Sequence, residues 1–254
     1  MSIYVVSHKK IDLADELPDG YIPFYVGPNR AELAAHRGVP DGLADNIASM
    51  NSSFCELTAM YWIWKNDKSQ YKGLVHYRRL FTSKKTKEIL KPEEICSILS
   101  DKKIIVPEKY WLLQTVKKHY SKHHNFDDLK MLRSIVNDLY PSYINAFDKC
   151  MKMKYVYPYN MLIAKSDDFD HYCSWLFPLL FELKRRNDLL GNNDISDVYQ
   201  RRVYGFLSER LMNVYLQATD LHPIETPVLL TEKNLKRDIS MNLASILNSR
   251  GVRA

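Results

Sequence analysis

The feature that most constrains the fold is the alternation of short apolar runs with longer segments of helical periodicity. We expect strands in the apolar runs at residues 3–6, 21–26, 73–81, 103–107 and 155–164. We expect helices in the segments at residues 45–65, 92–100, 127–153, 166–186 and 201–217. Such alternation is typical of an α/β fold, in which a mainly parallel sheet carries helices on both faces.

The length of 254 residues suits a single large domain or one domain with a small appendage. We therefore expect one domain over residues 1–232, followed by a basic, amphipathic C-terminal tail over residues 233–254. The segment 108–125 lacks a clear period and is expected to be irregular, basic and aromatic. In parallel sheets, ligands bind beyond the carboxyl ends of the strands, so the segments after residues 6, 75 and 106 are the places to look for a site.

Composition and missing motifs exclude several classes of protein. The four cysteines form no CxxC pair, which excludes the common zinc spacings and a disulfide framework and favours a reducing compartment. The first ten residues lack the pattern of a signal peptide, and no apolar run could span a bilayer, so we expect a cytoplasmic protein. There is no GxGxxG, phosphate-loop or GxSxG motif. The aromatic residues do not follow an RNA-recognition pattern, so no nucleic acid is expected as a partner.

The expected helix over residues 45–65 has two neighbouring stripes of residues at helical spacing and a polar residue at its amino end. Asp45 can cap its first turn, which is a purely structural role. Asn51 shares a stripe with Cys55 and Thr58, and a buried amide needs hydrogen-bond partners, which a ribose or a base could supply. Glu56 projects away from both stripes.

The sharpest local feature is the pair Arg78 and Arg79, which follows His76 directly after an apolar strand. A guanidinium group binds phosphate oxygens through a bidentate fork, so a nucleotide diphosphate is one target. The alternative is structural, with an arginine paired to an acidic residue of the core. The local sequence leaves both interpretations open.

Two later segments could meet a second substrate. Asn160 follows Tyr159 within a strand-like run, where a polar side chain could reach an acceptor sugar. Glu209 and Arg210 lie in a helix and can share a face with Arg202. Glu209 could take a proton from an acceptor hydroxyl, whereas an ion pair within the helix is the structural alternative.

Three histidines, His119, His123 and His124, have a spacing that could hold a metal ion. No acidic residue accompanies them as in the HExxH motif, so we expect no metal site there. The net charge is +6, and the positive residues occur in clusters along the chain. One cluster contains these histidines together with Lys117, Lys118 and Lys122. Charged clumps of this kind are either solvated surface or contacts for anionic lipid and phosphorylated substrates.

Several blocks together resemble the family known as domain of unknown function 4422. The resemblance rests on Asp45-Asn46-Ile47, Asn51, the run FCELTAMYWIWKN at 54–66, GLVHYRR at 73–79, Tyr159-Asn160-Met161 and GFLSERL at 205–211. It extends from the first strand to about residue 217. The family is associated with synthesis of capsule, exopolysaccharide and O-antigen, and its members resemble glycosyltransferases of the single-domain A-type fold.

The resemblance implies transfer of a hexose, with galactofuranose as the leading sugar, from a uridine diphosphate (UDP) donor to a lipid-linked glycan. The donor would lie near Asp45, Asn46, Asn51, His76, Arg78 and Arg79, and the acceptor near Tyr159, Asn160 and Arg210. Glu209 or Glu56 would be the base. The basic clumps and the tail would make peripheral contact with the anionic inner face of the plasma membrane.

The chain departs from A-type transferases in one respect. The strand that should end in a metal-binding Asp-x-Asp motif ends in the segment from His76 to Arg79, and Asp168-Phe169-Asp170 lies at an expected helix start, where capping explains it. We therefore expect Arg78 and Arg79 to replace the charge of the metal, with no metal cofactor. The rival interpretations are a sugar nucleotidyltransferase and a non-catalytic glycan-binding or scaffold protein of the same machinery.

Overall fold

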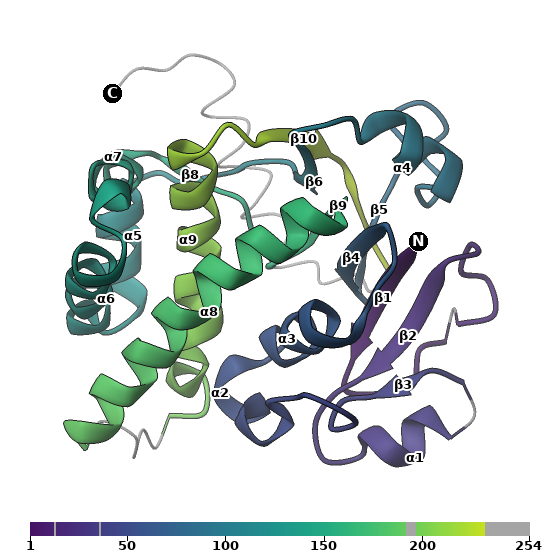
Figure 1. Ribbon diagram of the computed structural model, residues 1–254, viewed down its shortest axis with the longest axis horizontal. Coiled ribbons are helices and arrows are strands. Elements are labelled where there is room, and N and C mark those ends of the chain that lie inside the picture. Colours follow the sequence, from purple (N-terminus) through teal and green to yellow (C-terminus); the bar gives the residue numbers. More distant parts are fainter. Residues whose placement is uncertain (13, 36, 192–196, 232–254) are drawn as a thin grey trace.

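The computed structural model describes residues 1–231 apart from residues 13, 36 and 192–196 (Figure 1). Its strands are β1 (Ser2–Ser7), β2 (Tyr21–Tyr25), β3 (Val39–Pro40), β4 (Tyr71–His76), β5 (Arg79–Phe81), β6 (Lys103–Pro107), β7 (Tyr110–Trp111), β8 (Tyr155–Val156), β9 (Leu162–Lys165), β10 (His222–Thr226) and β11 (Val228–Leu230). Its α-helices are α1 (Arg30–Ala34), α2 (Asn51–Phe54), α3 (Leu57–Asn66), α4 (Pro92–Ile98), α5 (Val116–His123), α6 (Phe126–Leu139), α7 (Ile144–Lys152), α8 (Ser166–Leu189) and α9 (Val203–Ala218). The expected tail at 233–254 lies outside the described residues.

The central sheet is mainly parallel, which confirms the expected fold class. Its main path has the order β10-β6-β9-β4-β1-β2-β3, in which β9 runs antiparallel to both neighbours and the other strands share one direction. Two short strands extend it, since β5 pairs with β4 and β11 pairs with β5. Because β9 is reversed, its amino end lies at the same edge of the sheet as the carboxyl ends of β4 and β6.

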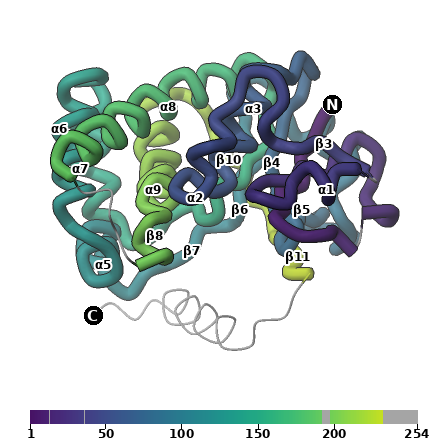
Figure 2. Tube along the Cα trace, turned by 90° about the horizontal axis from the view of Figure 1, so that it is seen from below, coloured from purple at the N-terminus to yellow at the C-terminus, as the bar shows by residue number. Residues whose placement is uncertain are grey.

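Both faces of the sheet are buried, and β1 shows how its sequence achieves this. Tyr4 and Val6 point into a large core formed with α2, α3 and α5 to α9, while Ile3 and Val5 point into a smaller core closed by α4 and the loops around it. Side chains alternate across a strand, so a continuous apolar run serves two cores at once. The long α8 crosses the face of the sheet that carries the large core, beside α3 (Figure 1). The helices α5, α6 and α7 lie together at the end of the molecule remote from β2 and β3 (Figure 2).

The continuous helix expected over residues 45–65 is wrong. The chain forms a short 3-10 turn (Ala48–Met50) and then α2, and it breaks at Cys55 before α3 begins. Cys55 has a φ of 51° and a ψ of −127°, outside the helical region. Asp45 therefore caps no helix. Its carboxylate accepts a hydrogen bond from the Tyr61 hydroxyl at 3.2 Å, and its backbone carbonyl accepts one from Asn66.

Two other expectations need correction. Residues 155–164 are not one strand, because β8 pairs with β7 in a separate two-stranded sheet and β9 belongs to the central sheet. Between them, Tyr159 and Asn160 form a tight turn with φ values of 77° and 52°. The segment 108–125 is not irregular, since it contains β7 and the helix α5, whose Thr115 side chain accepts a hydrogen bond from the backbone N–H of Lys118. Among the residues described, no helix has both the length and the apolar character that crossing a bilayer requires.

The close approach of β4 and β9 gives a test of the central sheet. A Cβ atom on Gly73 would lie 2.7 Å from Cγ1 of Ile163, its partner in the antiparallel register. We expect Gly73→Ala to lower the free energy of unfolding by about 1–3 kcal/mol through overpacking. Gly205→Ala is the matched control, because a Cβ there meets nothing within 4 Å. Denaturant unfolding measures both variants, and equal losses would contradict this packing.

Candidate active site

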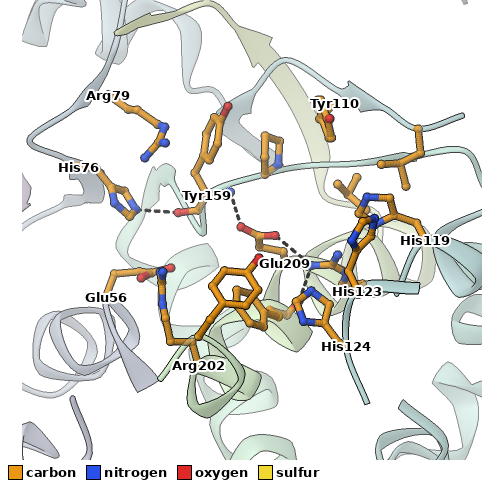
Figure 3. A pocket seen from close by; sticks show the side chains of 16 residues that line it. Glu56, His76, Arg79, Tyr110, His119, His123, His124, Tyr159, Arg202 and Glu209 are labelled. Atoms are coloured by element: carbon orange, nitrogen blue, oxygen red, sulfur yellow. Dashed lines mark hydrogen bonds and ion pairs between the residues drawn. The ribbon is translucent and has the colours of Figure 1, made fainter. Parts of the chain in front are cut away.

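Two adjoining cavities lie at the edge of the sheet where the parallel strands end. The strand-end cavity, of about 320 Å³, is lined at the ends of β1, β2 and β4 and at the break before α3 by Val6, Ser7, His8, Val26, Asn51, Cys55, Tyr77 and Arg78. The helix-side cavity, of about 510 Å³, lies between the Tyr159 turn, α5 and α9 (Figure 3). Four side chains line both cavities and mark where they meet: Glu56, His76, Arg79 and Arg202.

Glu56 owes its position to the chain break at Cys55. In a continuous helix it would project away from the packed stripes, whereas the positive φ of Cys55 turns the chain so that Glu56 faces both cavities. Oε1 of Glu56 accepts a hydrogen bond from Nδ2 of Asn160 at 2.7 Å. Asn51 stabilises the break, since its Nδ2 donates to the backbone carbonyl of Cys55 at 2.9 Å and to Thr58 Oγ1 at 3.2 Å.

Asn160 is buried behind Glu56 and its side chain is used entirely within the protein. Besides Glu56, its Nδ2 donates to the backbone carbonyl of Gly205 at 3.1 Å, and its Oδ1 accepts from Ser208 Oγ at 2.5 Å. An asparagine tolerates the left-handed backbone of this turn better than most residues do. The side chain predicted to touch an acceptor therefore positions the carboxylate of Glu56 instead.

The backbone of Tyr159 connects a histidine with a carboxylate. Its carbonyl lies 2.7 Å from Nε2 of His76, so Nε2 is the protonated, donating nitrogen of that ring. Its N–H donates to Oε1 of Glu209 at 2.9 Å. Burial lowers the pKa of His76, opposed by Glu56 and assisted by Arg79. His76 is therefore neutral at pH 7 and has a fixed tautomer.

Glu209 and Arg210 form an ion pair on the wall of the helix-side cavity. Arg210 Nη1 lies 3.0 Å from Oε2 of Glu209 and also donates to the carbonyl of Phe206 at 2.7 Å. Both carboxylate oxygens of Glu209 are therefore hydrogen-bonded, one to a backbone N–H and one to a guanidinium. Figure 3 shows Glu209 between the Tyr159 turn and the histidines of α5.

Two guanidinium groups, those of Arg79 and Arg202, lie where the cavities meet, and that of Arg78 lines the strand-end cavity beside them. Tyr77 and Arg78 form a two-residue turn between β4 and β5, and Thr231 holds this turn by hydrogen bonds to both backbone carbonyls, at 2.9 Å and 3.1 Å. Arg78 lies over the Tyr77 ring and Arg79 over the Tyr159 ring, at 4.9 Å and 4.2 Å from the ring centroids. Arg202 approaches from the opposite wall, where its Nε donates to Cys55 Sγ at 3.1 Å.

The far wall of the helix-side cavity is aromatic and contains the three histidines. The His124 ring lies 4.2 Å from the ring of Phe206, which in turn lies 4.9 Å from that of Tyr199. Burial, helped by the charge of Arg210, lowers the pKa of His119 and of His124 to about 4. Both rings are therefore neutral at pH 7, and this wall presents flat, uncharged surfaces.

In the part of the chain that the structure describes, no group of three or more His, Cys, Asp or Glu side chains is arranged to hold a metal ion. The Asp-x-Asp motif lies elsewhere, in the first turns of α8, where Asp170 forms a bidentate pair with the buried Lys72 at 2.8 Å and 2.9 Å. The N-cap residue of α8 is Lys165, and its side chain forms no capping hydrogen bond.

The structure brings most of the predicted site residues together. Asn51, His76, Arg78 and Arg79 line the strand-end cavity, and Tyr159 and Arg210 line the helix-side cavity with both candidate carboxylates. Asp45 and Asn46 line neither, and the Asn46 side chain bonds within its own loop, to the carbonyl of Ala44 and the N–H of Ala48. Sequence reasoning assigned no site role to Arg202, whose only signal was its helical spacing with Phe206 and Glu209.

Comparison with known proteins supports this description of the fold. The family model for the domain of unknown function 4422 matches residues 2–220. The solved structure of WbbM, a bifunctional glycosyltransferase in its apo form, is similar with a TM-score of 0.78 and 26% sequence identity. The alignment covers 92% of this chain and 45% of WbbM, so the chain spans less than half the length of that protein. The comparison with curated proteins gave no match.

Two neutral histidines, His119 on α5 and His124 directly after it, make stability depend on pH. An unfolded histidine titrates near pH 6.5, whereas His119 and His124 titrate near pH 4 in the folded chain. Between these values the unfolded state binds more protons, so the free energy of unfolding falls as the pH falls. From pH 7 to pH 5 we expect a loss of about 1 kcal/mol per histidine, after discounting for solvent screening of half-buried rings.

Denaturant unfolding at the two pH values measures this loss. The double variant His119→Gln and His124→Gln should lose less stability than the wild type between pH 7 and pH 5. His171→Gln, which alters an exposed histidine, is the control and should retain the full dependence. A double variant with the wild-type pH dependence would contradict the assignment.

Proposed function

This chain belongs to the domain of unknown function 4422 family, and we propose that it is a glycosyltransferase of bacterial surface polysaccharide synthesis. The proposed reaction moves a hexose from a UDP-sugar to a lipid-linked glycan. One observation carries the proposal: a carboxylate, a neutral histidine and two guanidinium groups lie where two cavities meet at the strand ends. Galactofuranose as the sugar rests on the family resemblance.

The strand-end cavity suits the nucleotide diphosphate. It opens beyond β1, β2 and β4, which is where ligands bind in open α/β sheets. Asn51 lines this cavity. Its Nδ2 donates both hydrogens within the protein, to Cys55 and Thr58. Its Oδ1 would accept a hydrogen bond from a ribose hydroxyl or a base N–H. Arg78, Arg79 and Arg202 would meet the phosphate oxygens in place of a metal ion.

The base is assigned to Glu56 in preference to Glu209. Glu209 lines the helix-side cavity alone, and its two oxygens accept hydrogen bonds from the Tyr159 N–H and from Arg210. Glu56 lies where the two cavities meet, held through one oxygen by Asn160. In the proposed step, the carboxylate of Glu56 takes the proton of the acceptor hydroxyl. The hydroxyl oxygen of the acceptor then bonds to the anomeric carbon of the donor sugar. The bond from the sugar to the diphosphate breaks, and the guanidinium groups stabilise the charge on the departing UDP.

Calorimetric titration with UDP, with and without manganese, tests the donor site. We expect the same dissociation constant in both conditions, and at least a tenfold weaker one for Arg78→Ala, because a charge-assisted bidentate contact would be lost. Lys84→Ala, which removes an exposed charge outside both cavities, should bind like the wild type.

Binding that appears only with manganese would disprove the replacement of the metal by arginine. The absence of binding in either condition would favour a glycan-binding or scaffold protein. Release of pyrophosphate, with UDP-sugar formed, would reveal a nucleotidyltransferase.

A pair of isosteric variants tests the base. We expect Glu56→Gln to lower kcat by about 10²–10⁴-fold, since the amide cannot take the proton, while UDP affinity is retained. Glu209→Gln keeps an acceptor for the Tyr159 N–H and should cost less. Release of UDP from UDP-galactofuranose, with a lipid-linked glycan as acceptor, measures both rates. A larger loss for Glu209→Gln would move the role of base to Glu209.

A further inference from the structure

A third cavity continues the row formed by the first two. It has a volume of about 230 Å³ and shares Tyr110, Leu112, His119 and His123 with the helix-side cavity. Its outer wall consists of Trp111, Leu113, Gln114 and Lys122. The three cavities therefore adjoin in one row, which we call the trough. It runs from the carboxyl ends of β1 and β4 past Glu56 to the loop between β7 and α5.

Two apolar side chains are exposed where this trough ends. Trp111 is 39% exposed and Leu113 is 67% exposed, whereas Leu112 between them is buried. The loop is fixed from both ends, since the N–H of Leu112 donates to the carbonyl of Lys154 at 2.7 Å and the N–H of Val116 donates to that of Met153 at 2.8 Å. The buried Leu112 and the paired backbone thus hold Trp111 and Leu113 outward.

Cationic side chains lie on the segments that flank these two residues, and Lys122 lines the same cavity as they do. Lys118 and Lys122 lie four residues apart on α5 and are exposed, and Lys154 is exposed beside Leu112. On the helices α6 and α7, which contact α5, Asp127 pairs with Lys130 and Asp148 pairs with Arg133. The positive charge near Trp111 and Leu113 is therefore not neutralised by these carboxylates. Figure 2 shows α5, β7 and β8 along the same side of the molecule.

We propose that Trp111, Leu113, Lys118 and Lys122 form a membrane-docking surface for an anionic phospholipid bilayer. Trp and Leu side chains insert at the level of the headgroups, and lysines attract anionic headgroups, which is the combination found on interfacial anchors. The role of this docking surface rests on the proposed function, because a lipid-linked acceptor has its lipid end in the bilayer. Docking at the outer end of the trough points the acceptor's glycan along the trough toward Glu56.

The full chain should bind vesicles of phosphatidylglycerol and phosphatidylcholine, and binding should weaken as salt rises. Vesicles of phosphatidylcholine alone should bind poorly. In co-sedimentation, we expect the double variant Lys118→Glu and Lys122→Glu to lower the partition coefficient at least about tenfold, from the loss of two lysine contacts. The double variant Trp111→Ser and Leu113→Ser should lower it to a similar extent.

Matched controls use the same substitutions elsewhere on the surface. Lys84→Glu with Lys87→Glu removes exposed lysines outside the trough, and Leu189→Ser with Leu190→Ser removes exposed leucines at the end of α8. Both controls should bind vesicles like the wild type. Wild-type binding by both docking variants, or an equal loss in the controls, would overturn the proposal. Equal binding to neutral and anionic vesicles would also overturn it, because the lysines would then not attract anionic headgroups. Binding to neither kind of vesicle would overturn it too, and would favour a protein-binding face.

UDP titration of the same variants separates the two proposals. Docking variants that lose vesicle binding but retain UDP affinity support the surface. A wild-type chain that binds vesicles through this surface but has no affinity for UDP supports the docking surface and contradicts the proposed function. Retained UDP affinity with unchanged vesicle binding of the docking variants refutes the surface alone.

Discussion

The site depends on the hydrogen bond between Asn160 and Glu56. It joins the turn before β9 to the break before α3, two segments 104 residues apart. Asn160 adopts its left-handed backbone at a cost that its three side-chain hydrogen bonds offset, to Glu56, Gly205 and Ser208. A buried amide with every partner satisfied is rigid, and this rigidity fixes the carboxylate where the two cavities meet.

The site also holds its arginine side chains in defined positions. Arg78 and Arg79 are held by a turn whose carbonyls bond to Thr231, and each guanidinium lies over an aromatic ring. Planar guanidinium groups match phosphate oxygens geometrically, and their orientation before binding reduces the reorganisation needed in a transition state. The neutral His76 adds a polar wall without adding charge. A strongly positive site thus contains a single carboxylate that faces both cavities.

Sequence reasoning identified the α/β class, the arginine pair and both carboxylates, because these depend on local pattern and residue type. Its errors have a shared cause. The periodic stripes of residues 45–65 predicted one helix, yet packing against α8 and α9 favours two helices joined by the unusual backbone of Cys55. The apolar run at 155–164 predicted one strand, but its two ends pair with different sheets. Asp45 and Asn46 lie near Asn51 in sequence, but they precede the 3-10 turn at Ala48–Met50 and lie in a loop.

By itself, the sequence determined the layered fold and the chemistry available to it, because strand and helix periodicity and the positions of arginine and glutamate are local properties. Only the tertiary structure decided which groups meet. The role of Asn160 as a support for Glu56, the hydrogen bond from the Tyr159 N–H to Glu209, and the row of three cavities depend on contacts between residues distant in the chain. Such contacts arise from burial and from the satisfaction of polar groups across the whole fold, which no local pattern encodes.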